Sequence, residues 1–378
     1  AGTDMNAIPA VAIKRIEVLR DGAAAQYGSD AIAGVINIQL KDYASGGEIG
    51  LSGGEYTEGD GQTINFNANT GFALGDDGYM NVSFNYRDRE STTRANPQGV
   101  CLYGGCVDTD GNGFFEPAPG NEDREVNSPS RDSFRIGDAD SEQTAVVVNA
   151  GVGLGEGELY GFITYSRRDN QSGAFNRNPA GSGAALDDGE NVIIDGFLPL
   201  INSEITDQSV NFGYRTEFDD GGMFDVSITQ GNNRIGYRTS NTVNYSYVNE
   251  LNFGQGLTDA EIREQIPRAA DAYEIQLALQ TINIDYSKPL GDWYIALGAE
   301  LREDEYTVTA GEEYSYNDYD TDMGVSLYPQ DAGGGTQGFG GIGPSSEADE
   351  TREVISFYTD IEWQATDRLL LNGAVRYD

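Results

Sequence analysis

The feature that most constrains the fold is a two-residue alternation of apolar and polar side chains that recurs along the chain after residue 41. In the segment TINFNANTGFAL, at 63–74, Ile64, Phe66 and Ala68 share one face, and asparagines share the other. The segment YMNVSFNYR, at 79–87, repeats this pattern. Such alternation is typical of strands with one apolar and one polar face, so the sequence predicts an antiparallel all-β architecture.

Segments of this kind are joined by connections that are short and long in turn. The eleven expected strands are 47–54, 63–74, 79–87, 144–153, 158–168, 209–218, 223–231, 281–290, 293–303, 354–363 and 368–378. Tight turns rich in Gly and Asp, such as GDDG at 75–78, join alternate pairs. The long connections are expected at about 89–141, 169–205, 235–272 and 305–350.

The apolar face of these strands could be the core of a soluble sandwich or the lipid-facing side of a membrane barrel. The side-chain pattern fits both, but connections of such length are unusual in a compact soluble domain. Barrels of bacterial outer membranes have short turns at one end and long loops at the other. Both tryptophans, Trp293 and Trp363, border short turns and are expected at one membrane interface. The connections therefore favour an antiparallel transmembrane β-barrel.

Charge and composition exclude other classes of protein. The chain has 62 acidic and 23 basic residues, a net charge of −39, which repels phosphate backbones, so we expect no binding of nucleic acid. It contains no His, so a Ser, His and Asp triad is impossible. No apolar stretch is long enough for a transmembrane helix.

Residues 15–38, RIEVLRDGAAAQYGSDAIAGVINI, form two apolar runs around a segment of small residues. This stretch resembles the carboxyl end of the plug domain of TonB-dependent outer-membrane receptors, with Asp21 and Gly22 where many members have Gly and Pro. The segments YMNVSFNYRDRE, ELYGFITYSRRDN, LGAELREDEY and RLLLNGAVRYD are similar to barrel strands of that family. The resemblance covers essentially the whole chain.

The resemblance implies a plug inside a barrel of about 22 strands. Residues 1–42 would be the C-terminal part of the plug, and residues 43–378 the N-terminal half of the barrel with its long extracellular loops. The odd number of strands also predicts that the chain is a fragment, because single-chain barrels close with an even number. The box that contacts TonB, which precedes the plug in this family, is expected outside the fragment.

The function that the resemblance implies is energised uptake of a scarce, bulky nutrient, such as an iron chelate, a corrinoid or an oligosaccharide, across the bacterial outer membrane. The implied partners are the TonB energy-transducing complex, outer-membrane lipid and a small-molecule ligand, and the family performs no enzymatic chemistry. The alternative hypothesis is a secreted or surface β-rich adhesion protein with calcium-binding loops. A passive porin conflicts with the plug-like stretch.

Members of the family hold plug and wall together with ion pairs, which implies roles for four charged residues. Glu17 and Arg20 flank the apolar pair of the plug strand, and strand parity directs Glu300 and Arg302 toward the lumen. We expect a pair such as Arg20 with Glu300, which would be costly to break singly if it is buried. The alternative is separate, solvated charges.

The segment DTDGNGFFE, which ends at Glu116, is similar to the start of a calcium loop. Asp108, Asp110 and Asn112 offer oxygen ligands, and Glu116 could add another. The twelfth position of the EF-hand pattern is Pro119 rather than Glu, so the pattern is incomplete. The hypothesis is a calcium ion in an extracellular loop, with no other cofactor, and the alternative is a set of Asx turns.

Cys101 and Cys106, in CLYGGC, are the only cysteines. Because the chain has no His, the usual zinc sites are disfavoured, and we expect a local disulfide in an oxidising compartment. The alternative is two unpaired thiols. The connection at 305–350 has ten acidic residues and no Lys or Arg, and is expected to be a solvated surface.

Overall fold

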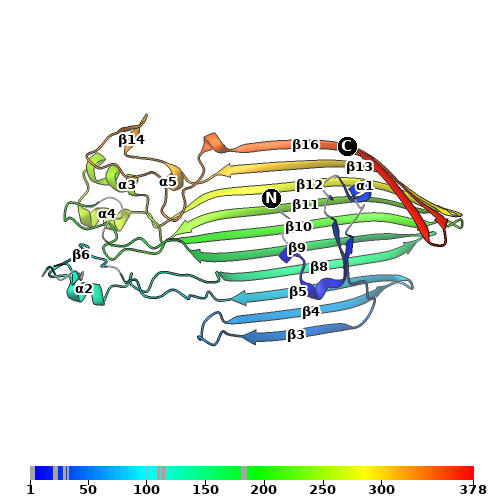
Figure 1. Ribbon diagram of the computed structural model, residues 1–378, viewed down its shortest axis with the longest axis horizontal. Helices are drawn as coiled ribbons and strands as arrows, with labels where there is room; N and C mark the ends of the chain where they lie inside the picture. Colours follow the sequence, from blue (N-terminus) through cyan, green and yellow to red (C-terminus); the bar gives the residue numbers. More distant parts are fainter. Residues whose placement is uncertain are drawn as a thin grey trace.

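A computed structural model of the chain describes residues 5–19, 24–28, 31, 34–99, 101–108, 111, 116–179 and 185–378. Its main element is an antiparallel sheet of eleven strands, in the order β17-β16-β13-β12-β11-β10-β9-β8-β5-β4-β3 (Figure 1). Apart from short strands in the loops, neighbours in the sheet are also consecutive along the chain. This up-and-down order is the one in which a β-barrel wall is built.

All eleven strands predicted from the sequence are present in this sheet, which confirms the predicted fold class. Their bounds are β3 (Gly47–Gly54), β4 (Thr63–Leu74), β5 (Gly78–Arg89), β8 (Asp140–Leu154), β9 (Gly157–Gly173), β10 (Leu200–Glu217), β11 (Met223–Ser240), β12 (Ala269–Leu290), β13 (Trp293–Ala310), β16 (Ala348–Thr366) and β17 (Leu369–Tyr377).

Several strands extend further toward the loops than the sequence predicts. Strand β12 begins at Ala269, whereas the sequence predicts a start at Thr281. The predicted start is too late because the alternation of apolar and polar residues changes phase near Gln280. Before that point Ile275, Leu277 and Leu279 share one face, whereas after it the apolar residues occupy the other face. A strand that continues through such a phase change loses its two-residue signal. Each long connection in the structure lies within its approximate predicted range and is slightly shorter than that range.

The four long connections cover residues 90–139, 174–199, 241–268 and 311–347, and they gather at one end of the sheet (Figure 1). Their short elements are β6 (Cys106–Val107), β7 (Glu116–Pro117), α2 (Glu122–Val126), α3 (Tyr245–Asn249), the π-helical turn η3 (Glu250–Gly254), α4 (Asp259–Gln265), α5 (Glu313–Tyr316), β14 (Thr321–Asp322), β15 (Val325–Ser326) and η4 (Pro344–Ser346). None of the described helices is long and apolar enough to cross a membrane.

The tight turns lie at the opposite end of the sheet. There Trp293 and Trp363 are directly paired across β13 and β16, and their rings stack with centroids 5.1 Å apart and planes 7° apart. The prediction that both tryptophans lie at one rim is therefore confirmed.

The N-terminal segment lies across one face of the large sheet, toward the tight turns (Figure 1). It comprises η1 (Met5–Ala7), η2 (Ala10–Ala12), β1 (Ile13–Leu19), α1 (Ala24–Tyr27) and β2 (Val35–Leu40). Strands β1 and β2 form an antiparallel hairpin that pairs with no other described strand. The turn η2 contacts β4 and β5, and α1 contacts β16 and β17. We call the face that carries this segment the inner face.

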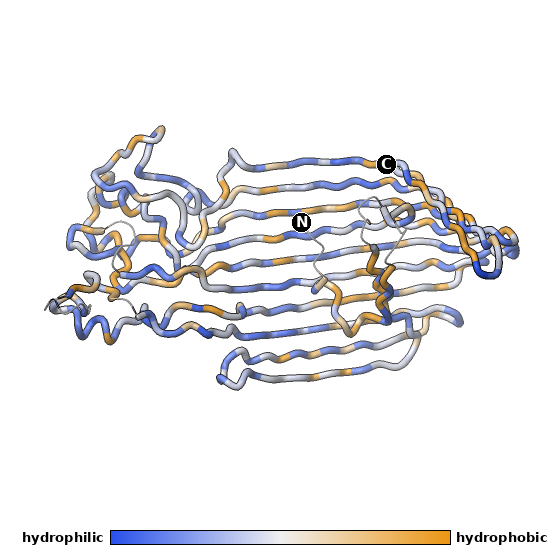
Figure 2. The backbone as a smooth tube through the Cα atoms, in the orientation of Figure 1, coloured by the Kyte–Doolittle hydropathy of each residue, from blue (hydrophilic) through white to orange (hydrophobic). Residues whose placement is uncertain are grey.

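The outer face of the sheet is apolar and uncovered over the half nearest the tight turns. Phe212, Leu301 and Ile355 are respectively 56%, 48% and 57% exposed. The alternation of apolar and polar residues along each strand is visible in Figure 2. A soluble sandwich would bury this surface, so its exposure fits a wall that faces lipid.

The loops contain the buried apolar cluster of the described residues. Its members are Leu186, Val192, Phe197, Val243, Tyr245, Val248, Leu251, Ile262 and Ile266. They come from two of the long connections, 174–199 and 241–268, and Tyr314 and Ala332 of the connection at 311–347 pack against them. Burial of these side chains stabilises the loops as one unit.

Candidate functional site

We call the N-terminal segment the hairpin segment and the sheet of eleven strands the wall. Arg376 of β17 is at the centre of one contact between them. Its Nη2 lies 2.9 Å from Glu300 Oε1, its Nε lies 2.6 Å from Asp378 Oδ1, and its Nη1 donates to the carbonyl oxygen of Ala25 at 3.5 Å. Only 9% of the Arg376 side chain is exposed. One guanidinium thus binds two strands of the wall to the helix α1 that lies against them.

A second polar contact lies beside the first. Gln26 Nε2 donates to Asp360 Oδ2 at 3.1 Å, and Asn372 Nδ2 donates to Asp360 Oδ1 at 2.7 Å. Asp360 is buried. Because Asn372 orients the carboxylate, Asp360 is held in position to accept a hydrogen bond from the hairpin segment.

On the other side of the segment, the wall binds main-chain carbonyl groups through neutral amides. Asn149 Nδ2 donates to the carbonyl of Lys41 at 3.1 Å, and Gln143 Nε2 donates to that of Asn6 at 2.6 Å. These contacts contain no formal charge, so each is weaker than a charge-assisted bond such as the one that Arg376 makes with Glu300.

Near the tight turns, a row of polar residues runs across the inner face of the wall. Tyr160 donates its hydroxyl to Asp225 at 2.7 Å, and Tyr358 donates its hydroxyl to Asp285 at 2.7 Å. Arg215 lies 2.6 Å from Glu158. Cross-strand pairs of this kind fix the register of the wall at the level where the hairpin is seated.

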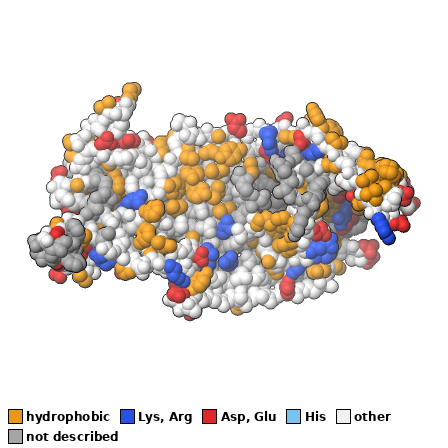
Figure 3. Space-filling model, in the orientation of Figure 1, with side chains coloured by type: hydrophobic (Ala, Val, Ile, Leu, Met, Phe, Trp, Pro, Cys, Tyr) orange, Lys and Arg blue, Asp and Glu red, His pale blue; other side chains and the backbone are white. Residues whose placement is uncertain are grey.

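Between the hairpin and the loops, the inner face becomes apolar and aromatic. Tyr237, Tyr273 and Phe339 contact one another, with ring centroids 5.0 Å, 5.9 Å and 6.0 Å apart. Next to them, Ile235 and Ile275 are opposite each other on β11 and β12. Figure 3 views this face and shows hydrophobic side chains gathered over the middle strands. This surface can pack against a ligand that has apolar or aromatic parts.

Ion pairs join the loops above this surface. Arg263 of α4 donates to both carboxylate oxygens of Asp188 at 2.8 Å and 3.2 Å, and Arg124 of α2 donates to both of Glu190 at 2.9 Å and 3.1 Å. The hydrogen bond from Arg263 lowers the pKa of the Asp188 carboxyl. Burial in the loop core raises the pKa of Tyr314 well above its ordinary value.

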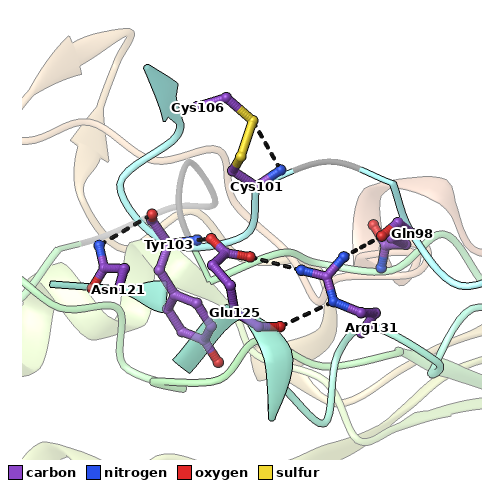
Figure 4. Close-up of a disulfide and its surroundings, with 7 residues drawn as sticks. All are labelled: Gln98, Cys101, Tyr103, Cys106, Asn121, Glu125 and Arg131. Carbon is purple, nitrogen blue, oxygen red and sulfur yellow. Dashed lines mark hydrogen bonds and ion pairs between the residues drawn. A yellow bond between two sulfur atoms is a disulfide. The ribbon is translucent and has the colours of Figure 1, made fainter. Parts of the chain in front are cut away.

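Cys101 and Cys106 form a disulfide in the connection at 90–139 (Figure 4). The chain between them passes through Tyr103, whose main-chain N–H donates to Glu125 Oε1 at 2.7 Å. Glu125 is buried and pairs with Arg131 at 2.7 Å. The hydroxyl of Tyr103 donates to Asp195 at 2.7 Å, which joins this loop to the connection at 174–199.

The comparisons with known proteins identify the hairpin segment. Residues 1–35 match the model of the TonB-dependent receptor plug domain. A segment of 105 residues is 31% identical to the vitamin B12 transporter BtuB of Vibrio vulnificus, and covers 27% of this chain and 16% of that protein. The N-terminal segment is therefore similar to the plug domain of TonB-dependent receptors.

Solved structures show the same fold for the large sheet of this chain. The chain superposes on the ferric enterobactin receptor PfeA of Pseudomonas aeruginosa with a TM-score of 0.57, at 15% identity, over 99% of this chain and 45% of that one. It superposes on the siderophore receptor PirA of Acinetobacter baumannii with a TM-score of 0.54, at 16% identity, over 99% and 44%. The chain thus spans less than half the length of these receptors.

Of the four charged residues expected to hold the plug, the structure describes Glu17, Glu300 and Arg302. Glu300 faces the inner side as predicted, and its partner there is Arg376. Glu17 accepts hydrogen bonds from Asn37 and Gln39 within the hairpin. Arg302 also faces inward, and lies 3.0 Å from Asp304.

Two groups of predicted residues fall wholly or partly outside the described part of the chain. Arg20 lies outside the described residues, and so do Asp110 and Asn112 of the calcium hypothesis. Asp108 Oδ1 accepts a hydrogen bond from the main-chain N–H of Gly111 at 2.7 Å, which is the geometry of a local turn. Glu116 lies in β7. Among the described residues, no group of three His, Cys, Asp or Glu is placed to hold a metal ion.

Sequence reasoning missed Arg376, Asp360 and Gln26. The alternation in RLLLNGAVRYD does place Arg376 on the polar face of its strand, so its direction could be read from the sequence. Its partner could not, because Glu300 and Arg376 belong to strands separated by β16.

Proposed function

We propose that this chain is the plug end and the first half of the barrel of a receptor that imports a scarce, bulky nutrient, such as an iron chelate, a corrinoid or an oligosaccharide. In this proposal residues 1–42 belong to the plug, and residues 43–378 form the wall and its loops. The observation that carries the proposal is the seating of the plug-like segment on the polar inner face, through Arg376 and Asp360.

The contacts suit a plug that must be both held and released. A single guanidinium and a few amide hydrogen bonds fix the described segment, and each is individually worth about 1 to 3 kcal/mol. A pulling force transmitted by TonB could therefore break them one after another, without unfolding the wall. In this proposal the receptor binds and moves its ligand, and performs no covalent chemistry on it.

The uncovered outer face favours the receptor over the adhesion hypothesis. Residues such as Phe212 and Ile355 would leave a secreted protein with a large apolar surface in water, which promotes aggregation. The aromatic surface of Tyr237, Tyr273 and Phe339 supports a ligand with apolar faces, which a corrinoid, an aromatic iron chelate or the ring face of a sugar would offer.

Uptake by the full-length protein tests the proposal. Cells that produce it would be given radiolabelled cobalamin, a ferric catecholate chelate and a maltooligosaccharide in parallel, with and without functional TonB. We expect one ligand to bind in both strains and to accumulate only where TonB functions. Equal accumulation without TonB, or recovery of the protein in the soluble fraction, would overturn the proposal.

A further inference from the structure

The outer face changes from apolar to polar between two successive rows of residues. The last apolar row, read across β10 to β16, contains Phe212, Ile228, Ile282, Leu301 and Ile355. The next outward-facing row contains Val210, Gln230, Gln280, Glu303 and Glu353. The boundary between hydrocarbon and headgroups therefore lies between these rows.

The height of the apolar zone agrees with this assignment. Trp293, at the rim near the tight turns, and Leu301 are both on the outer face of β13. Eight residues of a strand tilted by about 40° rise roughly 20 Å, close to the apolar band of about 25 Å in outer-membrane barrels. Gln280 and Glu303 therefore lie at the level of lipid headgroups on the side of the long loops.

A cavity of 470 Å³ straddles this boundary. Its lower part is aliphatic, with Ile163 and Val210, which are directly paired across β9 and β10. Its upper part is lined by side-chain amides and two carboxylates: Gln208, Gln230, Asn232, Gln280, Glu303 and Glu305. Ala278, the small residue between them on β12, leaves the space open.

We propose that this outer cavity binds a lipid whose headgroup is an acylated sugar. The acyl chains would continue the contact that the apolar band makes with the membrane, along Ile163 and Val210. The amides of Gln230 and Gln280 offer both donors and acceptors, which complement the hydroxyl and amide groups of a sugar headgroup. Glu303 and Glu305 repel a phosphate at the same level, so the cavity disfavours anionic phospholipids.

The test uses the full-length receptor in mild detergent and native mass spectrometry. The added probes are a phosphate-free acylated glucosamine disaccharide and, separately, phosphatidylglycerol, which is an anionic phospholipid. The test variant carries Gln230→Leu and Gln280→Leu, and the matched control carries Gln276→Leu. Gln276 is on the same face of β12, four residues from Gln280, and does not line the cavity.

We expect the double variant to bind the acylated sugar at least tenfold more weakly than the parent, since each lost hydrogen bond removes roughly a factor of five. The Gln276→Leu control should bind as the parent does. Leucine on a lipid-facing position is compatible with folding, and the heat-dependent gel mobility of both variants checks this. Unchanged binding by the double variant, an equal loss in the control, or tighter binding of phosphatidylglycerol than of the acylated sugar by the parent would each overturn the proposal.

Discussion

Tyr358 of β16 lies directly over Gly298 of β13, and its hydroxyl donates to Asp285 on the next strand at 2.7 Å. A Cβ atom on residue 298 would lie 2.0 Å from Cε1 of this ring. The ring of Tyr358 therefore occupies the space that a side chain at residue 298 would need.

We predict that Gly298→Ala destabilises the wall by about 1 to 3 kcal/mol, because the ring must move away from its hydrogen bond to Asp285. The midpoint of unfolding of the barrel in urea, followed by loss of heat-dependent gel mobility, measures this. Gly231→Ala is the matched control, since a Cβ there meets no atom within 4 Å. Equal midpoints for the two variants would contradict the prediction.

Arg376→Gln should loosen the hairpin segment. The substitution leaves the carboxylate of Glu300 partly buried without its guanidinium, at a cost on the order of 3 kcal/mol. Protease cleavage within residues 5–40 of the receptor in isolated outer membranes should become faster. Arg368→Gln, at the exposed turn before β17, should leave the cleavage rate unchanged.

A double-mutant cycle separates this contact from a general loss of stability. If the charges of Arg376 and Glu300 interact, adding Glu300→Gln to Arg376→Gln should recover part of the protection. Independent, additive effects of the two substitutions would show that the pair does not hold the segment.

Arg263→Gln should loosen α4 in a pH-dependent manner. The hydrogen bond from Arg263 lowers the folded-state pKa of Asp188 below its unfolded value of about 3.9, so its stabilising effect is present above that pH. The effect is lost as the pH falls through the folded-state pKa. Hydrogen exchange in residues 259–265, corrected for intrinsic rates, should be faster in the variant at pH 7 and should approach the parent's near pH 3.

Glu264→Gln, on the exposed side of the same helix, is the control for Arg263→Gln. It should leave the exchange rates of the helix unchanged at both pH values. A difference between Arg263→Gln and the parent that is as large at pH 3 as at pH 7 would argue against the contribution of Asp188.

Replacement of both Cys101 and Cys106 by Ser should destabilise the loop locally, by roughly 2 kcal/mol for a closed loop of this size. The segment around Tyr103 should become more accessible to proteases, while the wall keeps its unfolding midpoint, because the disulfide lies wholly within one connection. A fall in the midpoint of the whole barrel would instead show that the loop stabilises the wall.

The sequence was sufficient to predict the strands because lipid and lumen impose opposite chemistry on successive residues. The predicted strands were too short where the apolar and polar residues exchange faces, as at Gln280 of β12. From Gln280 toward the loops, the outer face is polar and the inner face carries Leu277 and Leu279. The strand continues there because its main-chain hydrogen bonds do not depend on which face is apolar.

The candidate site was only partly predictable for a different reason. Strand parity gave the inward direction of Glu300, but its partner Arg376 is 76 residues away and depends on the register of three adjacent strands. In the loops, Val243, Val248 and Ile262 are isolated apolar residues among polar ones, and nothing periodic indicates that they meet. The acidic connection at 305–350 was expected to be fully solvated, yet Asp320 is buried and accepts a hydrogen bond from Asn249.

The shared apolar cluster of the loops has a consequence for how ligand preference can change. Phe197 of the connection at 174–199 packs in one cluster with Val248 and Ile262 of the connection at 241–268, so lengthening or exchanging one connection alone would open a void beneath the other. New specificities are therefore more accessible through substitutions at the rim, or through exchange of these connections together as one cassette, than through the piecemeal transplantation that independent loops would tolerate.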